Sequence, residues 1–181
     1  MQYLDRPRLA KLFRVMYSAN KTHHLAALTA FWTGARVSQV LRLQGQDIFE
    51  SNGKIVVKIH AAKRGNERLH TLHVDSDPAF DMSPLIDLAA KRPLARLFGG
   101  TSRQYINLCL KRYCAEAGIH TDCGHMHVFR HSIAHEIWQG TQRLGAISEF
   151  LQHRSPTSSL CYLAEHEGKL AQEAVDAICL A

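Results

Sequence analysis

One stretch of the sequence, Leu28-Thr-Ala-Phe-Trp-Thr-Gly-Ala-Arg-Val-Ser-Gln-Val-Leu-Arg-Leu43, decides how the N-terminal part of the chain folds. Its first half is an apolar run that stops at Thr33-Gly34, and glycine is a common residue directly after a helix. Apolar residues return at helical spacing from Val37 to Leu43, which predicts a second helix. Arg36 therefore lies at a junction close to a helix N-terminus, where backbone N–H groups favour an anion.

The pattern on either side of this stretch is helical first and then extended. Asp5 can cap a first helix with Pro7 in its first turn, and the first 45 residues are helical in pattern. The helical spacing of apolar residues then stops, and two runs rich in β-forming residues follow, Lys54–His60 and Arg68–Val74. Residues 64–67 form a turn between them. This predicts a β-hairpin, with a short neighbouring strand near residues 47–50.

From Pro84 onward the pattern is helical again. Helices are predicted at Pro84–Lys91, Ser102–Glu116, His127–Trp138, Leu144–Leu151, Thr157–Leu163 and Lys169–Ile178. Gly118 and Gly140 are placed to end helices. The predicted fold is therefore α+β and mainly α-helical, with one small antiparallel sheet. No composition shift or linker divides the chain, so residues 1–181 are predicted to form a single domain.

Length and composition exclude several classes of protein. The 181 residues fit one domain, and 46% hydrophobic with 21% charged residues is a globular composition. No apolar run approaches the ~20 residues that span a bilayer, and Asp5, Arg6 and Arg8 interrupt the first stretch where a signal peptide would build its apolar core. Five cysteines, an odd number, are typical of a reducing compartment. We therefore expect a cytoplasmic, nucleoid-associated protein without membrane contact.

The net charge gives the first indication of what the protein binds. Lys and Arg outnumber Asp and Glu by 22 to 16, a net charge of +6, and twelve histidines add latent positive charge. A polyanion partner fits this balance, although many proteins of other classes are equally basic. Phosphate-binding glycine loops and the commoner hydrolase motifs are absent from the sequence. His131 with His135, and the span from Cys114 to His127, lack regular zinc spacing, so no metal or other cofactor is expected.

Four segments carry the chemistry when they are taken together. They are the Thr33-Gly-Ala-Arg36 junction, the hairpin with Lys63 and Arg68, the run His127-Val-Phe-Arg130, and Leu151-Gln-His153 followed nine residues later by Tyr162. His127 and Arg130 share one helix face at i,i+3 spacing. Each residue alone has an ordinary interpretation as a surface charge, a helix cap or a half-buried aromatic. Only their joint order and spacing favours a catalytic site.

This set closely resembles the tyrosine recombinase (phage integrase) family, from about residue 4 to residue 165. The family pattern is an arginine in T-G-x-R-x-S-E, a hairpin lysine, an H-x-x-R box, a histidine or tryptophan in L-G-H, and a tyrosine nine residues later. The matching residues are Arg36, Lys63, His127, Arg130, His153 and Tyr162. The sequence departs from the pattern in three places: Gln39 replaces the usual acidic residue, Gln152 the usual glycine, and His70-Thr71-Leu72 the usual Val-Pro-Leu.

The resemblance implies a site-specific recombinase that cuts and rejoins duplex DNA through a 3′-phosphotyrosyl link on Tyr162, without metal or ATP. The six matching residues are then catalytic. Four further residues are predicted to contact DNA: Arg64, Arg68, Arg103 and His131. Two alternatives stay open, a non-catalytic DNA-binding protein on the same scaffold and a type IB topoisomerase-like enzyme.

The resemblance also implies how the chain assembles. Family members usually carry an N-terminal helical domain that closes around DNA, and this chain begins where the catalytic domain would begin, so we expect either a truncated chain or a naturally short member. Assembly as a tetramer on two DNA sites is expected, and accessory DNA-bending proteins are possible partners. A C-terminal helix at residues 167–180 is predicted to pack either on a neighbouring subunit or on its own domain.

Overall fold

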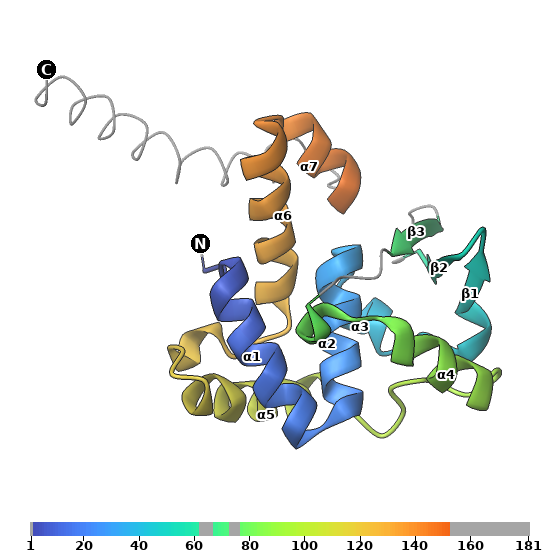
Figure 1. Cartoon of the computed structure of the whole chain (residues 1–181), viewed down its shortest axis with the longest axis horizontal. Coiled ribbons are helices and arrows are strands. Elements are labelled where there is room, and N and C mark those ends of the chain that lie inside the picture. The colour runs from blue at the N-terminus through green and yellow to red at the C-terminus, as the bar shows by residue number, and fades with distance from the viewer. Residues whose placement is uncertain (1, 62–66, 73–76, 153–181) are drawn as a thin grey trace, which may run out of the picture. The chain divides into compact units, whose positions relative to one another are not determined.

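The computed structural model describes residues 2–61, 67–72 and 77–152, and these form two compact units. The first comprises Gln2–Ile133 and the second begins at Ala134. Figure 1 labels their helices and strands. The elements are α1 (Arg6–Ala19), α2 (Lys21–Thr33), α3 (Val37–Val40), β1 (Ile48–Ser51), β2 (Lys54–Ile59), β3 (Arg68–Leu72), α4 (Ser83–Lys91), α5 (Arg103–Glu116), α6 (His127–Thr141) and α7 (Leu144–Leu151).

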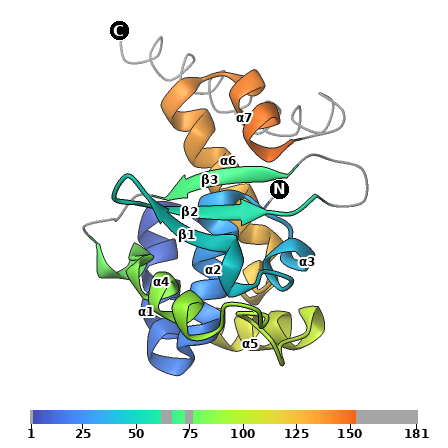
Figure 2. The ribbon, with the colours of Figure 1, turned by 90° about the vertical axis from the view of Figure 1, so that its right-hand side faces the viewer.

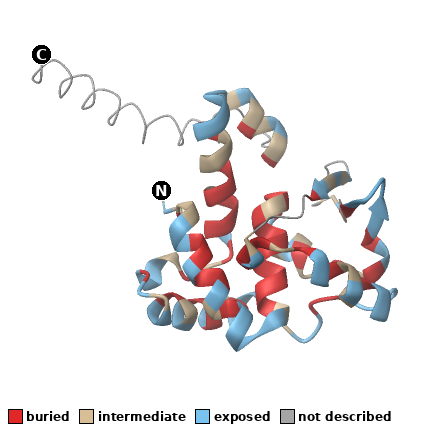
Figure 3. Cartoon of the chain, viewed as in Figure 1, coloured by how far each residue is buried: buried red, intermediate tan, exposed pale blue. Residues whose placement is uncertain are grey.

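The two N-terminal helices form as their sequences predict. The Asp5 carboxylate caps α1 by accepting a hydrogen bond from the Arg8 N–H at 3.0 Å, and Pro7 lies in the first turn. Helix α2 is buried along almost its whole length, as the continuous red ribbon in Figure 3 shows. A helix that is apolar on all sides belongs in the centre of a fold. Helix α2 is therefore the axis on which the first unit is built.

An aromatic cluster joins helices that are far apart in the sequence. The Phe13 ring on α1 lies 6.1 Å from Phe31 on α2, 5.2 Å from Phe80 and 5.5 Å from Phe129 on α6, measured between centroids. Aromatic pairs at these separations contribute about 0.5–1.5 kcal/mol each beyond their burial. The Arg6 guanidinium lies 3.7 Å from the Phe80 centroid in a cation–π contact. The start of α6 is thereby fixed against α1 and α2.

The small sheet has the order β1-β2-β3 and is antiparallel throughout (Figure 2). Asn52 and Gly53 make the β1–β2 turn with φ values of +52° and +70°, which is the geometry of a tight hairpin turn. The predicted hairpin and its neighbouring strand are thus confirmed. The last strand is described as far as Leu72, and residues 73 and 74 of the predicted strand lie outside the described residues.

Two helix predictions need correction. The helix predicted for residues 37–43 is shorter: α3 spans only Val37–Val40, and the N–H groups of Arg42 and Leu43 bond to carbonyls three residues back rather than four. Gly118 follows α5 with a left-handed φ of +68°, as predicted, but Gly140 does not end α6. That helix continues to Thr141 and ends before Gln142, whose φ is +52°. Glycine inside a helix costs only about 1 kcal/mol, which packing overrides here.

The second unit is described as far as Gln152. Ala134 and Trp138 on α6 pack with Ile147 and Leu151 on α7 in a small apolar cluster of its own. The helices predicted at 157–163, 169–178 and 167–180 lie outside the described residues. Within the described part of the chain no helix is both long and apolar enough to cross a bilayer. The fold class, mainly helical with a small antiparallel sheet, is confirmed. The single-domain organisation stays a prediction.

Candidate functional site

The end of α2 fixes the backbone around Arg36. Gly34 takes a left-handed conformation with φ +60°, and its N–H donates to the Phe31 carbonyl. Ala35 is buried, and its N–H donates to the Thr33 hydroxyl at 3.2 Å. The Arg36 N–H in turn donates to Oε1 of Gln39 at 3.1 Å. The chain therefore turns sharply with its backbone groups satisfied, and the Arg36 side chain is left exposed.

Arg130 reaches the same junction from α6. It is only 3% exposed, and its guanidinium Nη1 donates to the Gly34 carbonyl oxygen. The two preceding residues, Val128 and Phe129, are fully buried, so the first turn of α6 is anchored in the core. Arg130 thus binds the backbone two residues before Arg36, although Arg36 and Arg130 are 94 positions apart in the sequence.

His127 begins α6 beside these two arginines. Partial burial lowers the pKa of its imidazole, and the positive charges of Arg130, His125 and Arg36 lower it further. Its ring meets the His131 ring edge to face, with centroids 4.4 Å apart. Burial lowers the pKa of His131 to about 4, with further contributions from His127, His125 and Arg130. Both imidazoles are therefore neutral at neutral pH, and a neutral imidazole can accept a proton.

A pocket of about 270 Å³ opens between these elements. It is lined by Arg36, Val37, Ser38, Arg103, Asn107, His125, Met126 and His127. None of these eight residues is acidic, so two guanidiniums face the pocket without a carboxylate among its lining. Such a pocket is suited to an anion. We call it the arginine pocket.

The wall of the arginine pocket depends on a close approach between α5 and the segment before α6. Asn107 accepts a hydrogen bond from the Met126 N–H at 3.0 Å. A Cβ atom on Gly124 would lie 2.6 Å from the Lys111 Cα, so only glycine fits there. The sequence predicts Arg103 as a functional residue, but not Asn107 or His125. Asn107 follows Arg103 by four residues and therefore shares its helix face, a signal that could have identified it.

The hairpin contributes a further positive charge. Arg68 is the first residue of β3, and its pKa is lowered by burial and by the charge of Arg36, which places the two guanidiniums within electrostatic range. Lys63, Arg64, His153 and Tyr162 lie outside the described residues. Of the six residues predicted to be catalytic, the structure therefore brings together Arg36, His127 and Arg130.

Gln39, at the position where the resembled pattern has an acidic residue, has a defined structural role. Its Oε1 accepts from the Arg36 N–H, and its Nε2 donates to the His60 carbonyl at 2.8 Å. A carboxylate could replace the first contact but not the second, because an ionised carboxylate only accepts hydrogen bonds. Gln39 therefore links the backbone of Arg36 to the end of β2.

Comparison with known proteins agrees with this arrangement. The sequence pattern of the phage integrase family matches residues 2–168, nearly the whole chain. The chain belongs to the phage integrase family. No curated protein sequence matches it.

Solved structures of phage integrases and related recombinases share the fold. The XerH site-specific recombinase bound to its difH substrate, in a pre-cleavage complex, matches 90% of this chain with a TM-score of 0.73 and 21% identity. The catalytic domain of bacteriophage HP1 integrase matches 91% with a TM-score of 0.65 and 22% identity. The match covers 50% of the XerH chain and 88% of the HP1 domain, so this chain spans about half the length of XerH.

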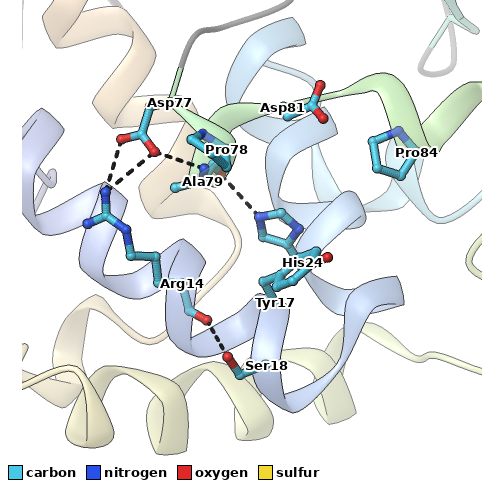
Figure 4. A pocket seen from close by; sticks show the side chains of 9 residues that line it. All are labelled: Arg14, Tyr17, Ser18, His24, Asp77, Pro78, Ala79, Asp81 and Pro84. Atoms are coloured by element: carbon cyan, nitrogen blue, oxygen red, sulfur yellow. Dashed lines mark hydrogen bonds and ion pairs between the residues drawn. The ribbon is translucent and has the colours of Figure 1, made fainter.

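A second pocket of this phage integrase family member, about 340 Å³ in volume, lies at the end of α1 (Figure 4). There the Arg14 guanidinium pairs with the Asp77 carboxylate at 3.2 Å, and His24 Nε2 lies 3.1 Å from the Ala79 carbonyl. Asp81 lines the same pocket. Its one arginine is therefore paired with a carboxylate, in contrast to the arginine pocket, and no residue predicted to be functional lines it.

Proposed function

We propose that this chain is the catalytic domain of a site-specific recombinase that cleaves and rejoins duplex DNA through a 3′-phosphotyrosyl intermediate on Tyr162. The observation that carries the proposal is that Arg36 and His127 line a cationic pocket without acidic residues, while Arg130 is anchored beside them at the Gly34 carbonyl. Family membership supports the class of reaction.

Arg36 and Arg130 would stabilise the transition state on the phosphodiester. As phosphorus becomes pentacoordinate, negative charge builds up on the nonbridging oxygens, and planar guanidiniums can offer paired N–H donors to them. The junction at Gly34 holds these two residues in place before DNA arrives. Preorganised donors of this kind stabilise a transition state more than the ground state. His153 would add a hydrogen bond to the same phosphate.

The two proton transfers require a base and an acid. His127 is held neutral by the lowered pKa and would take the proton from the Tyr162 hydroxyl, whose ordinary pKa is near ~10. Lys63 would donate a proton to the departing 5′-oxygen. The phosphorus–oxygen bond to tyrosine forms as the bond to the 5′-oxygen breaks, so the bond energy is kept and religation requires no ATP.

The proposed partner is double-stranded DNA, contacted by Arg64, Arg68, Arg103 and His131 in addition to the catalytic residues. Arg103 lines the arginine pocket, and Arg68 lies within electrostatic range of Arg36. Two duplexes held by a tetramer, with or without DNA-bending accessory proteins, would complete the reaction.

A nicked-duplex trap tests the proposal. We would incubate the chain with a pool of duplexes that each carry one nick inside a randomised segment, so that the short 5′-hydroxyl strand diffuses away after cleavage and religation fails. Covalent protein–DNA adducts are then isolated and sequenced. We expect one sequence motif to be enriched, and the Tyr162→Phe variant to bind DNA without forming an adduct.

The other outcomes separate the alternatives. Adducts on sequences of every kind indicate a topoisomerase-like enzyme, and binding without adducts indicates a non-catalytic DNA-binding protein. An adduct that persists in Tyr162→Phe means that a different tyrosine is the nucleophile, with Tyr105 and Tyr113 the next to test.

A further inference from the structure

His60 makes an unusual set of contacts just after β2. Its Nε2 lies 2.7 Å from Oδ1 of Asp47, and its Nδ1 lies 3.0 Å from Oε1 of Glu67. Asp47 is the last residue of a short 3₁₀ helix and is 3% exposed, whereas Glu67 directly precedes β3. Both ring nitrogens of one imidazole therefore face carboxylate oxygens on different elements.

This geometry selects the charged form of His60. A neutral imidazole has one N–H donor and one lone pair, whereas the imidazolium has two donors. Because ionised carboxylates only accept, the neutral ring would direct a lone pair at an oxygen. The hydrogen bond that His60 donates to the Asp47 carboxylate, together with the one to the Glu67 carboxylate, raises the pKa of His60 accordingly. Lys58 on β2 also faces Glu67, at 2.8 Å, and helps to lower the pKa of that carboxyl.

The backbone of His60 is linked by hydrogen bonds to Arg36, which lines the arginine pocket. The His60 carbonyl accepts from Gln39 Nε2, and Gln39 Oε1 accepts from the Arg36 N–H. Gly45 secures the 3₁₀ helix that carries Asp47, because its N–H donates to the Arg92 carbonyl and a Cβ there would lie 2.4 Å from the Ala89 oxygen. His60 is thus connected to a rigid support on one side and to Arg36 on the other.

The position of His60 and Glu67 in the chain gives these contacts a function. They flank residues 61–66, which contain Lys63, the proposed acid for the 5′-oxygen. We propose that His60 is a positioning residue for DNA cleavage, whose imidazolium joins Asp47 to Glu67 and so fixes both ends of the segment that carries Lys63. This inference rests on the proposed function. It assigns His60 a role that the recombinase motifs do not include.

The test uses two versions of the DNA sequence enriched in the trap, one with the natural 5′-oxygen at the cleaved bond and one with a bridging 5′-sulfur. A thiolate is a good leaving group without a proton, so the sulfur substrate bypasses the acid. For His60→Gln we expect cleavage of the oxygen substrate to fall by roughly 10- to 100-fold, since a small misplacement of a reacting group costs that much. The rate at which His60→Gln cleaves the sulfur substrate should stay within about threefold of the wild-type rate, because that leaving group needs no proton.

Two further variants provide the reference points. Lys63→Ala should cleave the oxygen substrate still more slowly, by about 10²-fold or more relative to wild type. Its cleavage of the sulfur substrate should again be close to the wild-type rate. His120→Gln removes another histidine that faces a carboxylate, Asp122 at 3.4 Å, but one that is exposed and outside the proposed site. It should cleave both substrates at the wild-type rate.

A nuclear magnetic resonance titration adds a readout that does not depend on cleavage. The His60 imidazole should titrate above its ordinary 6.5, so the contact is complete below that raised pKa and is lost as the pH rises through it. Glu67→Gln removes one exposed carboxylate and should move the His60 titration to lower pH. This exposed substitution also serves as the second cleavage variant, with a smaller loss on oxygen than His60→Gln.

The results separate this inference from the proposed function. Absence of any wild-type adduct on either substrate contradicts the proposed function. Wild-type cleavage with equal losses on oxygen and sulfur in His60→Gln would mean that His60 only supports the fold, and unchanged rates would mean that it has no role; either result overturns the inference. An ordinary His60 titration would do so as well.

Discussion

Two helices of this chain end with the same backbone geometry but with different residues. Helix α2 ends at Gly34 with φ +60°, two residues before Arg36, and α7 ends at Gln152 with φ +48°, one residue before His153. Gly34 is buried, whereas Gln152 is exposed. The left-handed conformation is free of steric cost for glycine and costs roughly 1–2 kcal/mol for a residue with a Cβ atom.

The turn at Gly34 is held by a contact from a distant part of the sequence. At Gly34 the carbonyl oxygen also binds the Arg130 guanidinium, so the turn is specified both by its own residue and by a contact from α6. At Gln152 the N–H donates to the Glu149 carbonyl, a bond within the helix end itself. The turn before Arg36 is therefore supported locally and by tertiary structure, and the turn before His153 carries a local strain.

The largest effect is expected when the tertiary contact at Gly34 is broken. Arg130→Lys keeps the charge but loses the planar group that can hold two oxygens and still reach the Gly34 carbonyl. We expect the cleavage rate to fall by about 10²-fold or more, which is the usual cost of removing a preorganised donor. Binding of uncut DNA should change far less, because other phosphate contacts remain. Single-turnover cleavage and a binding titration on the same duplex measure the two effects.

Arg14→Lys is the matched control for this substitution. Arg14 pairs with Asp77 in the pocket of Figure 4 and is 62% exposed, so replacing it should leave cleavage unchanged. Equal losses of binding and cleavage in Arg130→Lys would show that Arg130 only holds DNA. A scissile methylphosphonate, which carries one negative oxygen fewer, should partly restore the Arg130→Lys rate if the guanidinium neutralises transition-state charge.

A smaller effect is expected from Gly34→Ala. The Cβ atom makes the left-handed turn unfavourable by roughly 1–2 kcal/mol, and relaxation of the turn would move the carbonyl that Arg130 binds. We expect a small loss of thermal stability and a cleavage rate lower by about tenfold, since catalytic groups tolerate little displacement. Gly118→Ala places the same methyl group at another left-handed helix end, after α5, with no atom within 4 Å. It should lose stability only, and a matching loss of cleavage there would contradict the role of Gly34.

The sequence predicted the residues of the site better than the contacts that hold them. Arg36, His127 and Arg130 were recognisable because a motif preserves order and spacing, and the hairpin was recognisable because two β-rich runs flank a turn. The hydrogen bond from Arg130 to the Gly34 carbonyl joins positions 96 residues apart, and no local pattern encodes it. The roles of Gln39 and His60 likewise could not be predicted from the sequence, since each depends on which groups of distant residues lie within hydrogen-bonding distance.

The helix ends show the same limit in detail. Gly34 and Gly118 were predicted as helix ends and do end helices, whereas Gly140 lies inside α6. Left-handed turns fall instead on Gln142 and Gln152, residues that local propensity would not choose. Where a helix ends is therefore decided in part by the packing of the helices it joins, here the apolar cluster of Trp138 with Ile147 and Leu151.

The smallest effect is expected at Gln152, where the strain can be relieved. Gln152→Gly removes about 1–2 kcal/mol of left-handed strain but gives the unfolded chain extra freedom worth up to about 1 kcal/mol, so a net stabilisation of roughly 0.5–1 kcal/mol should remain. The Gln152 side chain is exposed, so little packing is lost. A thermal melt should show a rise of about 2 °C for a chain of this size. Gln152→Ala keeps the Cβ atom and should leave the midpoint unchanged; if alanine stabilises the chain as much as glycine, the strain does not come from the backbone, and the contrast between the two helix ends is wrong.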